Sequence, residues 1–231
     1  MSERSPTFRV HVGGPLACFT RPEFKVERVS YEVLTPSAAR GILEAIHWKP
    51  AIRWVVTRIH VLSPIKFIGF RRNEVNSRVS VTNILQAMKG TLFPSYFADE
   101  DRAQRNTVAL RDVEYVIEAH FVRGEKWHDN DNVPKHADIF ARRLEKGQTF
   151  HQPYLGCREF AASVEPADGP LKCRLPAEQR NKDLGWLLHD MEFGPPIRPR
   201  FFRARLEEGV IDIPPFEDAI GVISSGAGGK T

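Results

Sequence analysis

Cysteine is scarce in this chain of 231 residues, which contains three: Cys18, Cys157 and Cys173. The number is odd, the three positions lie far apart, and no C-x-x-C pair occurs. Disulfide frameworks use paired cysteines and zinc knuckles use closely spaced ones, so the sequence indicates neither. We therefore expect a protein of a reducing compartment, the cytoplasm, with no metal and no other cofactor.

A long apolar run is also missing. No stretch of about 18 apolar residues occurs, which is the length that a membrane-spanning helix needs. The opening stretch MSERSPTFRVHV has charges and a proline where a secretory signal would be continuously apolar. We therefore expect no membrane contact. Hydrophobic residues still make up 42% of the chain, enough for a core, so disorder of the whole chain is excluded.

Acidic residues are nearly absent between residues 45 and 98, where Glu74 is the one acid. The same segment has eight basic residues: Lys49, Arg53, Arg58, Lys66, Arg71, Arg72, Arg78 and Lys89. It therefore carries a charge of +7 whereas the whole chain carries +4, which leaves −3 for the rest. Such a concentrated basic stretch predicts a polyanionic partner, with an ordinary solvated face as the alternative.

Hydrophobic periodicity predicts the elements of the first half. Alternating β-formers over residues 8–19 predict a strand, broken at Gly13-Gly14. Residues 35–48 have apolar positions at helical spacing, with Thr35 suited to the N-cap and a proline at the first helical position. We therefore expect a helix there, followed by one long strand over 53–70 with interleaved basic residues.

The same reading continues toward the C-terminus. It predicts an irregular insertion with one short helix over about 71–104, a strand over 105–123, a helix over 133–148 and a strand over 153–166. In the second helix we expect Ile139, Phe140 and Leu144 to face inward and Gly147 to act as the C-cap.

The resulting order, β-α-β-β-α-β, predicts an α+β fold of the ferredoxin-like type that also underlies RNA-recognition modules. We expect residues 1–166 to form this domain around the insertion. Residues 167–223 predict a small β-rich C-terminal domain, with a hairpin turning at Glu208-Gly209. The tail 224–231 is of low complexity and is expected to be mobile.

Two histidines and a lysine are candidates for catalysis because of where these helices put them. The two helices should run antiparallel, so the end of the first and the start of the second lie at the same end of the sheet. His47 and the pair Lys135-His136 should then come close together. One imidazole suits a base for a ribose 2′-hydroxyl, the other an acid for the leaving 5′-oxygen, and the lysine a partner for the phosphate charge.

Each of these residues also has a structural interpretation. A histidine on a last helical turn often only stabilises the helix dipole, by about 0.3–1 kcal/mol. A Lys-His pair on a first turn is often solvated surface. Trp48, next to His47, suits stacking on a base but equally a place in the core or at its rim. Spacing alone leaves these alternatives open.

Three long motifs carry a family resemblance: LACFTRPEFKVERVSYEVLTPSAARGILEAIHWKP, NTVALRDVEYVIEAHF and PYLGCREF. From about Val10 to Val164 the chain resembles the Dvulg, or type I-C, branch of the fifth CRISPR-associated protein family. Several motifs agree in order and spacing, so the resemblance is more specific than one short pattern. It thins out across the C-terminal segment.

The resemblance implies a metal-independent endoribonuclease that cuts the repeat hairpins of CRISPR precursor transcripts by attack of the 2′-hydroxyl. It also implies that the protein stays on the 5′ handle of the guide RNA, in a complex with the large and backbone subunits of type I-C. The family's catalytic lysine and histidine match Lys135 and His136. Its catalytic tyrosine falls on His47, which departs from the family pattern.

For contacts with the RNA backbone we select basic residues of the insertion, of the exit from the first helix and of the region after the first strand, together with Trp48 for stacking. They are Arg21, Lys25, Lys49, Arg71, Arg72 and Arg78.

Two rival functions remain at this point. The first is a subunit that holds the guide without cutting it, which the altered position 47 favours and the intact Lys135-His136 pair opposes. The second is binding of double-stranded DNA through the basic surface, since phosphate contacts do not depend on sequence. DNA lacks the 2′-hydroxyl, so the same chemistry would not cut it.

Overall fold

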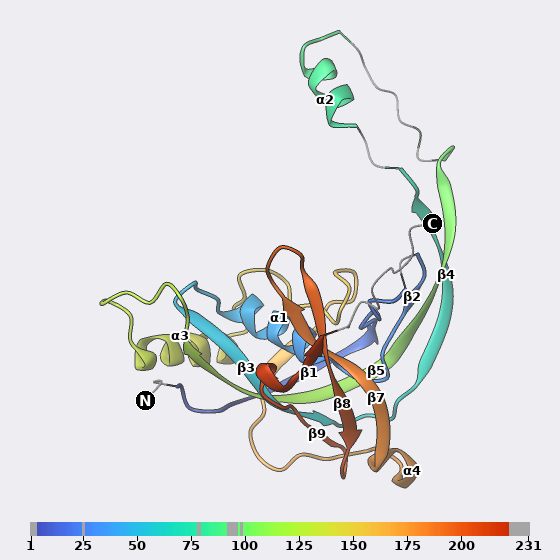
Figure 1. Cartoon of the computed structure of the whole chain (residues 1–231). Coiled ribbons are helices and arrows are strands. Elements are labelled where there is room, and N and C mark those ends of the chain that lie inside the picture. The colour runs from blue at the N-terminus through green and yellow to red at the C-terminus, as the bar shows by residue number, and fades with distance from the viewer. Residues whose placement is uncertain (1–3, 25, 78–79, 92–96, 98, 222–231) are drawn as a thin grey trace, which may run out of the picture.

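The computed structural model describes residues 4–24, 26–77, 80–91, 97 and 99–221. It consists of two sheets, two longer helices packed on the larger sheet, and a hairpin that projects from the body (Figure 1). The strands are β1 (Phe8–Ala17), β2 (Arg28–Val29), β3 (Ile52–Val61), β4 (Phe67–Val75), β5 (Arg102–Arg123), β6 (Ser163–Pro166), β7 (Lys182–Glu192), β8 (Arg198–Leu206), β9 (Val210–Asp212) and β10 (Ile220–Gly221). The helices are α1 (Pro36–Ile46), α2 (Val81–Met88), α3 (Val133–Glu145), α4 (Ala177–Arg180) and the 3-10 turn η1 (Phe216–Asp218).

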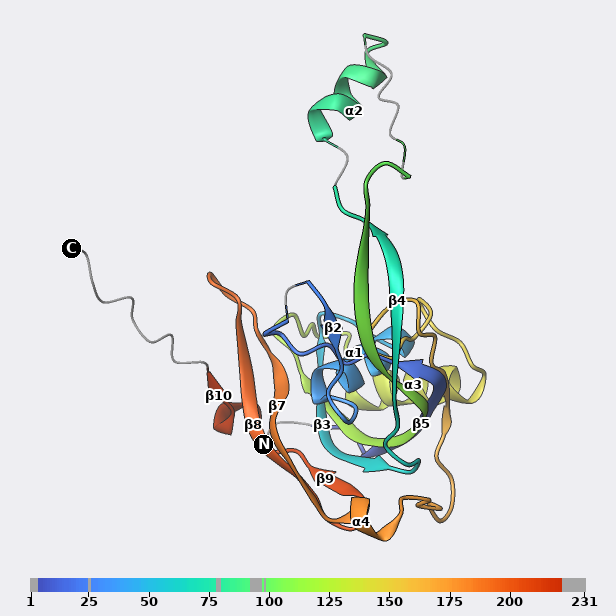
Figure 2. The ribbon, with the colours of Figure 1, turned by 90° about the vertical axis from the view of Figure 1, so that its right-hand side faces the viewer.

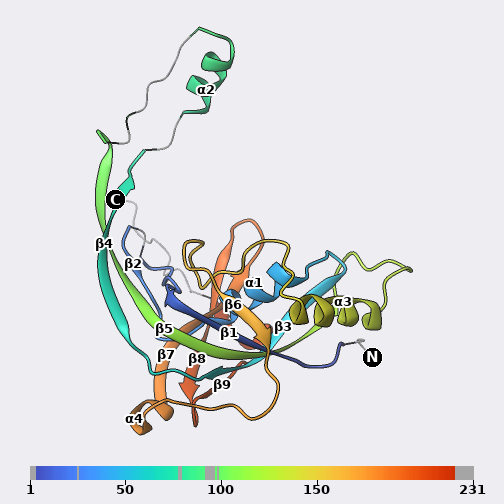
Figure 3. The ribbon, with the colours of Figure 1, turned by 180° about the vertical axis from the view of Figure 1, so that it is seen from behind.

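The larger sheet has seven strands, and its main path runs β6-β1-β5-β3-β9. β5 is its centre, because it pairs antiparallel with β1 on one side and with β3 on the other. α1 and α3 lie on the same concave face of this sheet (Figures 1 and 3). α1 buries Ala39, Ile42, Leu43 and Ile46, the apolar stripe that its helical spacing predicts.

Local signals set the ends of both helices. Thr35 is the N-cap of α1, and its hydroxyl oxygen accepts a hydrogen bond of 3.3 Å from the N–H of Ala38. Asn132 caps α3 in the same way, accepting from the N–H of Lys135 at 2.8 Å. Beyond the last residue of α3, Gly147 has a φ of 62°, the left-handed conformation expected of a glycine at a helix C-terminus.

The buried face of α3 differs in part from the prediction. Phe140 and Leu144 face inward as expected, but Ile139 is half-buried and His136 completes the buried row. These three positions are four residues apart, so they form one stripe along the helix. The histidine therefore belongs to the packed side of α3 and not to its solvated side.

The prediction of one strand over 53–70 is wrong. β3 ends at Val61 and β4 begins at Phe67, because Pro64 in between has no N–H to donate to a ladder. Both strands then pair with different parts of β5, β3 with its second half and β4 with its first. The ends of the expected insertion are therefore strands, and β4 and β5 form a long hairpin that carries α2 at its tip (Figure 2).

Two further strand predictions need correction. β1 is not broken at the glycines, since Gly13 and Gly14 keep the ladder with β5. A Cβ on Gly14 would lie 2.6 Å from Leu155 Cδ1, so this glycine permits a close approach. The strand expected over 153–166 is reduced to β6, because the chain turns at Gly156, whose φ of 83° a strand does not allow.

The C-terminal part forms a second sheet of three strands in the order β10-β8-β7. The turn expected at Glu208-Gly209 is present, and both residues have positive φ, 50° and 81°, as a two-residue hairpin turn requires. Its two arms then separate, because β9 pairs with β3 of the larger sheet while β8 pairs with β7. Leu187 and Phe202 share one buried core with the residues of the larger sheet.

Within the part of the chain described above, no helix is long and apolar enough to cross a membrane. The predicted mobile tail 224–231 lies outside the described residues.

Candidate active site

His47 and His136 lie in direct contact, where the C-terminal end of α1 meets the first turn of α3. His47 is the C-cap of α1, and its backbone N–H donates to the carbonyl of Leu43 at 3.0 Å. His136 follows the N-cap of α3 by four residues. Nε2 of His47 lies 3.1 Å from Nδ1 of His136, so the two rings share one hydrogen bond.

The partners at the two ends of this pair determine which nitrogen carries each proton. A guanidinium N–H of Arg143 lies 3.5 Å from Nδ1 of His47 and can only donate, so that nitrogen accepts. His47 then carries its proton on Nε2 and donates it to Nδ1 of His136. His136 in turn donates from Nε2 to the carboxylate of Asp131 at 3.1 Å. The result is one chain of hydrogen bonds that runs from Arg143 through both imidazoles to Asp131.

The surroundings keep His47 uncharged near neutral pH. Its burial lowers its pKa to about 4, and His136, whenever it is protonated, acts in the same direction, as do the cations Arg143 and Lys49. Asp131 stays ionised, because the backbone N–H of His128, followed by His136 and Lys135, holds the pKa of its carboxyl below the usual value. The chain therefore ends in a fixed negative charge.

Both imidazoles are closed off from solvent. His47 is 1% exposed and His136 is 3% exposed. The indole N–H of Trp54 donates to the carbonyl of His47 at 2.9 Å, and the Trp127 ring lies 5.9 Å from the ring of His136. The segment 124–132 before α3, which contains Trp127 and Asp131, thus forms part of the cover of His136.

Lys135 is the exposed member of the predicted group, with 48% of its side chain accessible. Its ammonium group donates to the carbonyl of Asn130 at 3.1 Å and lies 3.9 Å from the Asp131 carboxylate. The exposed ammonium group thus lies beside Asp131, the carboxylate at which the chain of hydrogen bonds ends.

Sequence reasoning missed Asp131 and Arg143, which complete the chain of hydrogen bonds. Arg143 follows His136 by seven residues, which is two helical turns, so the two share a face of α3 and a signal was present. Asp131 directly precedes the N-cap of α3, but no sequence pattern connects it to His136. Trp127, which covers His136, lies in a loop and has no periodic signal either.

The residues predicted to contact RNA fall into two groups. Trp48 and Lys49 follow His47 directly and are exposed. Arg71 and Arg72 lie on β4, on the opposite side of the molecule from α3 (Figures 1 and 3). Arg71 is exposed, whereas Arg72 forms ion pairs with Glu74 and Glu159.

The other predicted contacts are less uniform. The guanidinium of Arg21 lies over the Tyr31 ring, 4.5 Å from its centroid, and pairs with Glu23 at 3.7 Å. Lys25 and Arg78 lie outside the described residues. The structure thus brings one tryptophan and one lysine to the histidine pair and leaves the arginines of β4 at a distance from it.

Comparisons with known proteins agree on one family. The sequence model described as CRISPR-associated protein (Cas_Cas5), of the Cas5d type, matches residues 7–214. A relative from Mannheimia succiniciproducens named "CRISPR pre-crRNA endoribonuclease Cas5d" is 51% identical over 214 residues, covering 90% of this chain and 95% of the relative. One of the same name from Thermus thermophilus is 42% identical over 225 residues, covering 89% and 90%.

Solved structures show the same likeness. One described as a CRISPR-associated protein has a TM-score of 0.68 at 26% identity, covering 95% of this chain and 97% of that one. A functionally uncharacterized protein from Streptococcus mutans has a TM-score of 0.67 at 24% identity, with the same coverage, and shares the fold. Because the family model spans most of the sequence and two relatives exceed 40% identity over about nine-tenths of it, the chain belongs to the Cas5d family of CRISPR-associated proteins.

Proposed function

We propose that this chain is an endoribonuclease that cuts CRISPR precursor transcripts within their repeats, at a site formed by His47, Lys135 and His136. The observation that carries the proposal is the hydrogen bond of 3.1 Å between the two imidazoles, extended to the Asp131 carboxylate, which also lies 3.9 Å from the Lys135 ammonium group. Two titratable rings in contact, with a cation beside them, suit proton transfer at a phosphodiester. Both curated relatives are named for this activity.

In the proposed mechanism the nucleophile comes from the substrate. His136 is the better candidate for the base, because Asp131 fixes its proton on Nε2 and leaves Nδ1 as the acceptor. The ribose 2′-hydroxyl would take the place of His47 at this nitrogen, give up its proton and attack the adjacent phosphorus. The expected products are a 2′,3′-cyclic phosphate and a 5′-hydroxyl. No step of this reaction calls on a metal ion.

His47 and Lys135 supply the remaining functions. A phosphodiester bound beside Lys135 would oppose the positive charges that lower the pKa of His47, so His47 would bind a proton more readily in the complex. The protonated ring then suits the role of acid for the 5′-oxygen. Lys135, at the positive end of the α3 dipole, would stabilise the charge of the phosphorane.

The experiment uses the purified chain, its cognate repeat RNA and EDTA. One RNA is unmodified and the other has a single 2′-deoxy nucleotide at the cut position. We expect cleavage of the first and survival of the second, with equal binding of both. Cleavage of the deoxy substrate would contradict attack by the 2′-hydroxyl. Binding of both RNAs without any cleavage would contradict the proposed endoribonuclease activity.

One observation favours a second function, that of a subunit which holds the guide RNA without cutting it. Both imidazoles are almost fully buried, so a substrate contact depends on a rearrangement of their cover. In that case His47 and His136 would only fix α1 against α3. The cleavage assay separates the two functions, because a holding subunit binds the repeat tightly and leaves it intact.

The proposal also includes the architecture and the partners. The strand order β6-β1-β5-β3, with α1 and α3 on one face, supports a ferredoxin-like domain over residues 1–166 and a small β-rich domain over 167–223. We expect the chain to remain on the 5′ handle of the guide in the cytoplasm, bound to the large and backbone subunits of a type I-C complex. Copurification of these subunits with the tagged chain, before and after ribonuclease treatment, tests this assembly.

The apolar face of α2 supports a protein contact at the tip of the hairpin. Val81, Ile84, Leu85 and Met88 recur at the spacing of a docking helix, and each is between 43% and 79% exposed. Binding of double-stranded DNA is the remaining proposed contact, through the arginines of β4. Its affinity should fall steeply as salt is raised, independently of sequence.

A further inference from the structure

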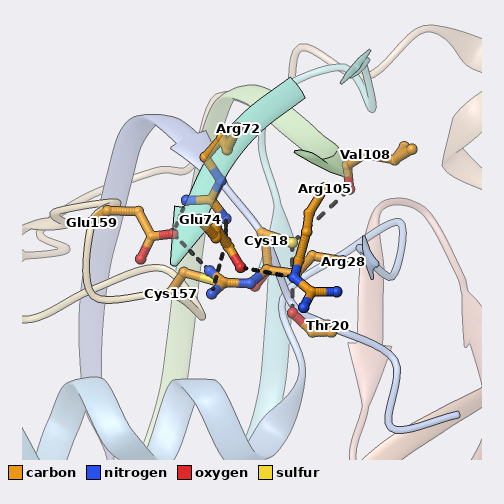
Figure 4. Close-up of polar contacts among 9 residues, drawn as sticks. All are labelled: Cys18, Thr20, Arg28, Arg72, Glu74, Arg105, Val108, Cys157 and Glu159. Atoms are coloured by element: carbon orange, nitrogen blue, oxygen red, sulfur yellow. Dashed lines mark hydrogen bonds and ion pairs between the residues drawn. The ribbon is translucent and has the colours of Figure 1, made fainter. Parts of the chain in front are cut away.

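Two cysteines that are 139 residues apart in the sequence lie side by side at the base of the projecting hairpin (Figure 4). Cys18 follows the end of β1 and is fully buried, whereas Cys157 lies in the loop before β6 and is half-buried. The Cys157 sulfur lies 3.6 Å from the carbonyl oxygen of Cys18 and 3.6 Å from a guanidinium nitrogen of Arg28. This cluster is separate from the histidine pair.

Each protonation state of Cys157 has its own hydrogen-bond partner. As a thiol, Cys157 donates to the carbonyl of Cys18. As a thiolate, it accepts from the Arg28 guanidinium, and the neighbouring Cys18 thiol also favours this state. Cys18 has alternative contacts, since its sulfur lies 3.6 Å from the Thr20 hydroxyl.

These contacts favour the thiolate at Cys157. The hydrogen bond with Cys18 is the largest influence, and together with Arg28 and Thr20 it outweighs burial and Glu159 and holds the pKa of Cys157 below its ordinary value. The same hydrogen bond, together with burial, raises the pKa of Cys18. The pair therefore loses its first proton from Cys157, the more accessible of the two.

The neighbouring charges accommodate this negative sulfur. Three arginines meet two glutamates here: Arg28, Arg72 and Arg105 surround Glu74 and Glu159 (Figure 4). The five side chains together carry one net positive charge. A thiolate at Cys157 makes the cluster neutral, so the ion pairs do not have to rearrange when it forms.

We propose that Cys157 is a nucleophilic thiol site that reacts with low-molecular-weight disulfides. In the reaction the Cys157 thiolate attacks one sulfur of the reagent and its S–S bond breaks. A new S–S bond joins Cys157 to one half, and the other half leaves as a thiolate that takes a proton from water. The cysteine sulfur is oxidised and the released sulfur is reduced, so the electrons balance.

Cys173 provides a matched reference within the same chain. It is also a half-buried free thiol, and its sulfur also lies 3.6 Å from a carbonyl oxygen, that of Val61. Cys157 differs from it by the contacts with Arg28 and Cys18. Any difference in reactivity that depends on pH can therefore be traced to those contacts.

The experiment measures alkylation of the full chain by iodoacetamide between about pH 5 and pH 9, with each cysteine followed by peptide mass spectrometry. We expect the Cys157 rate to reach half of its plateau at a lower pH than the Cys173 rate does, since the pKa of Cys157 is lowered. At the pH of the Cys157 midpoint, the Cys157 rate should therefore be a larger fraction of its plateau than the Cys173 rate is of its own. Access changes the plateau and not the midpoint, so equal midpoints for the two cysteines would overturn the proposal.

Two variant pairs and one reagent complete the test. Arg28→Met and Cys18→Ala should raise the Cys157 midpoint, whereas Arg28→Lys and Cys18→Ser, which keep a charge or a donor, should largely preserve it. Neutral hydroxyethyl disulfide near pH 6.5 should add one half-reagent to Cys157 and none to Cys173. Equal addition to both, or none to Cys157, would contradict the proposed reactivity even if every variant failed to fold.

Discussion

Nε2 of His47 lies 3.1 Å from Nδ1 of His136, and this hydrogen bond joins the C-terminal end of α1 to the first turn of α3. Because Arg143 and Asp131 occupy the outer nitrogens, one proton, that of His47 Nε2, lies in the contact between the two rings. A substrate hydroxyl that reaches Nδ1 of His136 has to displace His47. This hydrogen bond is therefore present in the proposed site without substrate, and it has to break before a substrate can bind to Nδ1 of His136.

Replacing His47 tests whether the pair is catalytic. We expect His47→Ala to slow single-turnover cleavage of repeat RNA by about 10²–10⁴-fold, the usual contribution of an acid or base. His47→Tyr, which introduces the residue that the resemblance implies at this position, should keep much of the rate. His151→Ala is the matched control, since His151 is exposed and its Nδ1 lies 3.3 Å from the backbone oxygen of the next residue, Gln152. A normal rate for His47→Ala would remove His47 from the mechanism.

Folding stability should depend on pH through His47. Its folded pKa of about 4 lies below the ordinary value of 6.5, so between these values the unfolded chain binds the extra proton. The contribution of His47 to the free energy of unfolding is therefore complete above about pH 6.5 and falls as the pH drops toward 4. The free energy of unfolding of the chain and of His47→Gln can be measured with urea at several pH values in this range. Plotted against pH, it should rise less steeply for the variant. Identical slopes would contradict the shifted pKa.

Lys135 should affect cleavage far more than stability. Its side chain is half-exposed, so Lys135→Ala removes a charge without opening a cavity. We expect a loss of about 10²–10³-fold in the cleavage rate, with partial recovery in Lys135→Arg. Lys146→Ala, an exposed lysine at the other end of α3, serves as the control. An equal effect of both substitutions would indicate general attraction of RNA and not a place at the reacting phosphate.

Asp131 should act by positioning His136. Its carboxylate accepts the Nε2 proton of His136, so Asp131→Ala frees the ring to carry its proton on either nitrogen. We expect the chemical step to slow by about 10²–10⁴-fold while RNA affinity changes little. Asp129→Ala, two residues earlier and exposed, is the comparison. A loss of affinity without a loss of rate would show that Asp131 only holds the loop.

Arg71 tests whether the hairpin contacts the RNA backbone. It is exposed on β4, so its removal should leave stability nearly unchanged. If it contacts a phosphate, Arg71→Ala should weaken binding at low salt and reduce the slope of log affinity against log salt by about 0.7–0.9. Arg102→Ala, on the adjoining end of β5 and paired with Asp99, provides a second measurement on the same hairpin. An unchanged slope for both would exclude the hairpin from the interface.

Local chemistry in the sequence determined the helices and the end of the sheet at which they meet. Thr35 and Pro36 begin α1, Gly147 follows α3, and the apolar spacing of α1 indicates which of its faces is buried. These signals act between residues a few positions apart, so they are visible without the fold. Together with the strand order they brought His47 and His136 to the same place.

Only the tertiary structure decided how that place is built. Arg143 and Asp131 join the histidines through contacts of side chains, and the burial of both rings depends on Trp54 and on the loop before α3. The strand break at Pro64 was missed because a continuous run of β-formers hides a single residue without an N–H. Cys18 and Cys157 looked unrelated in the sequence, since only the close packing of Gly156 on the Cys18 carbonyl brings them together.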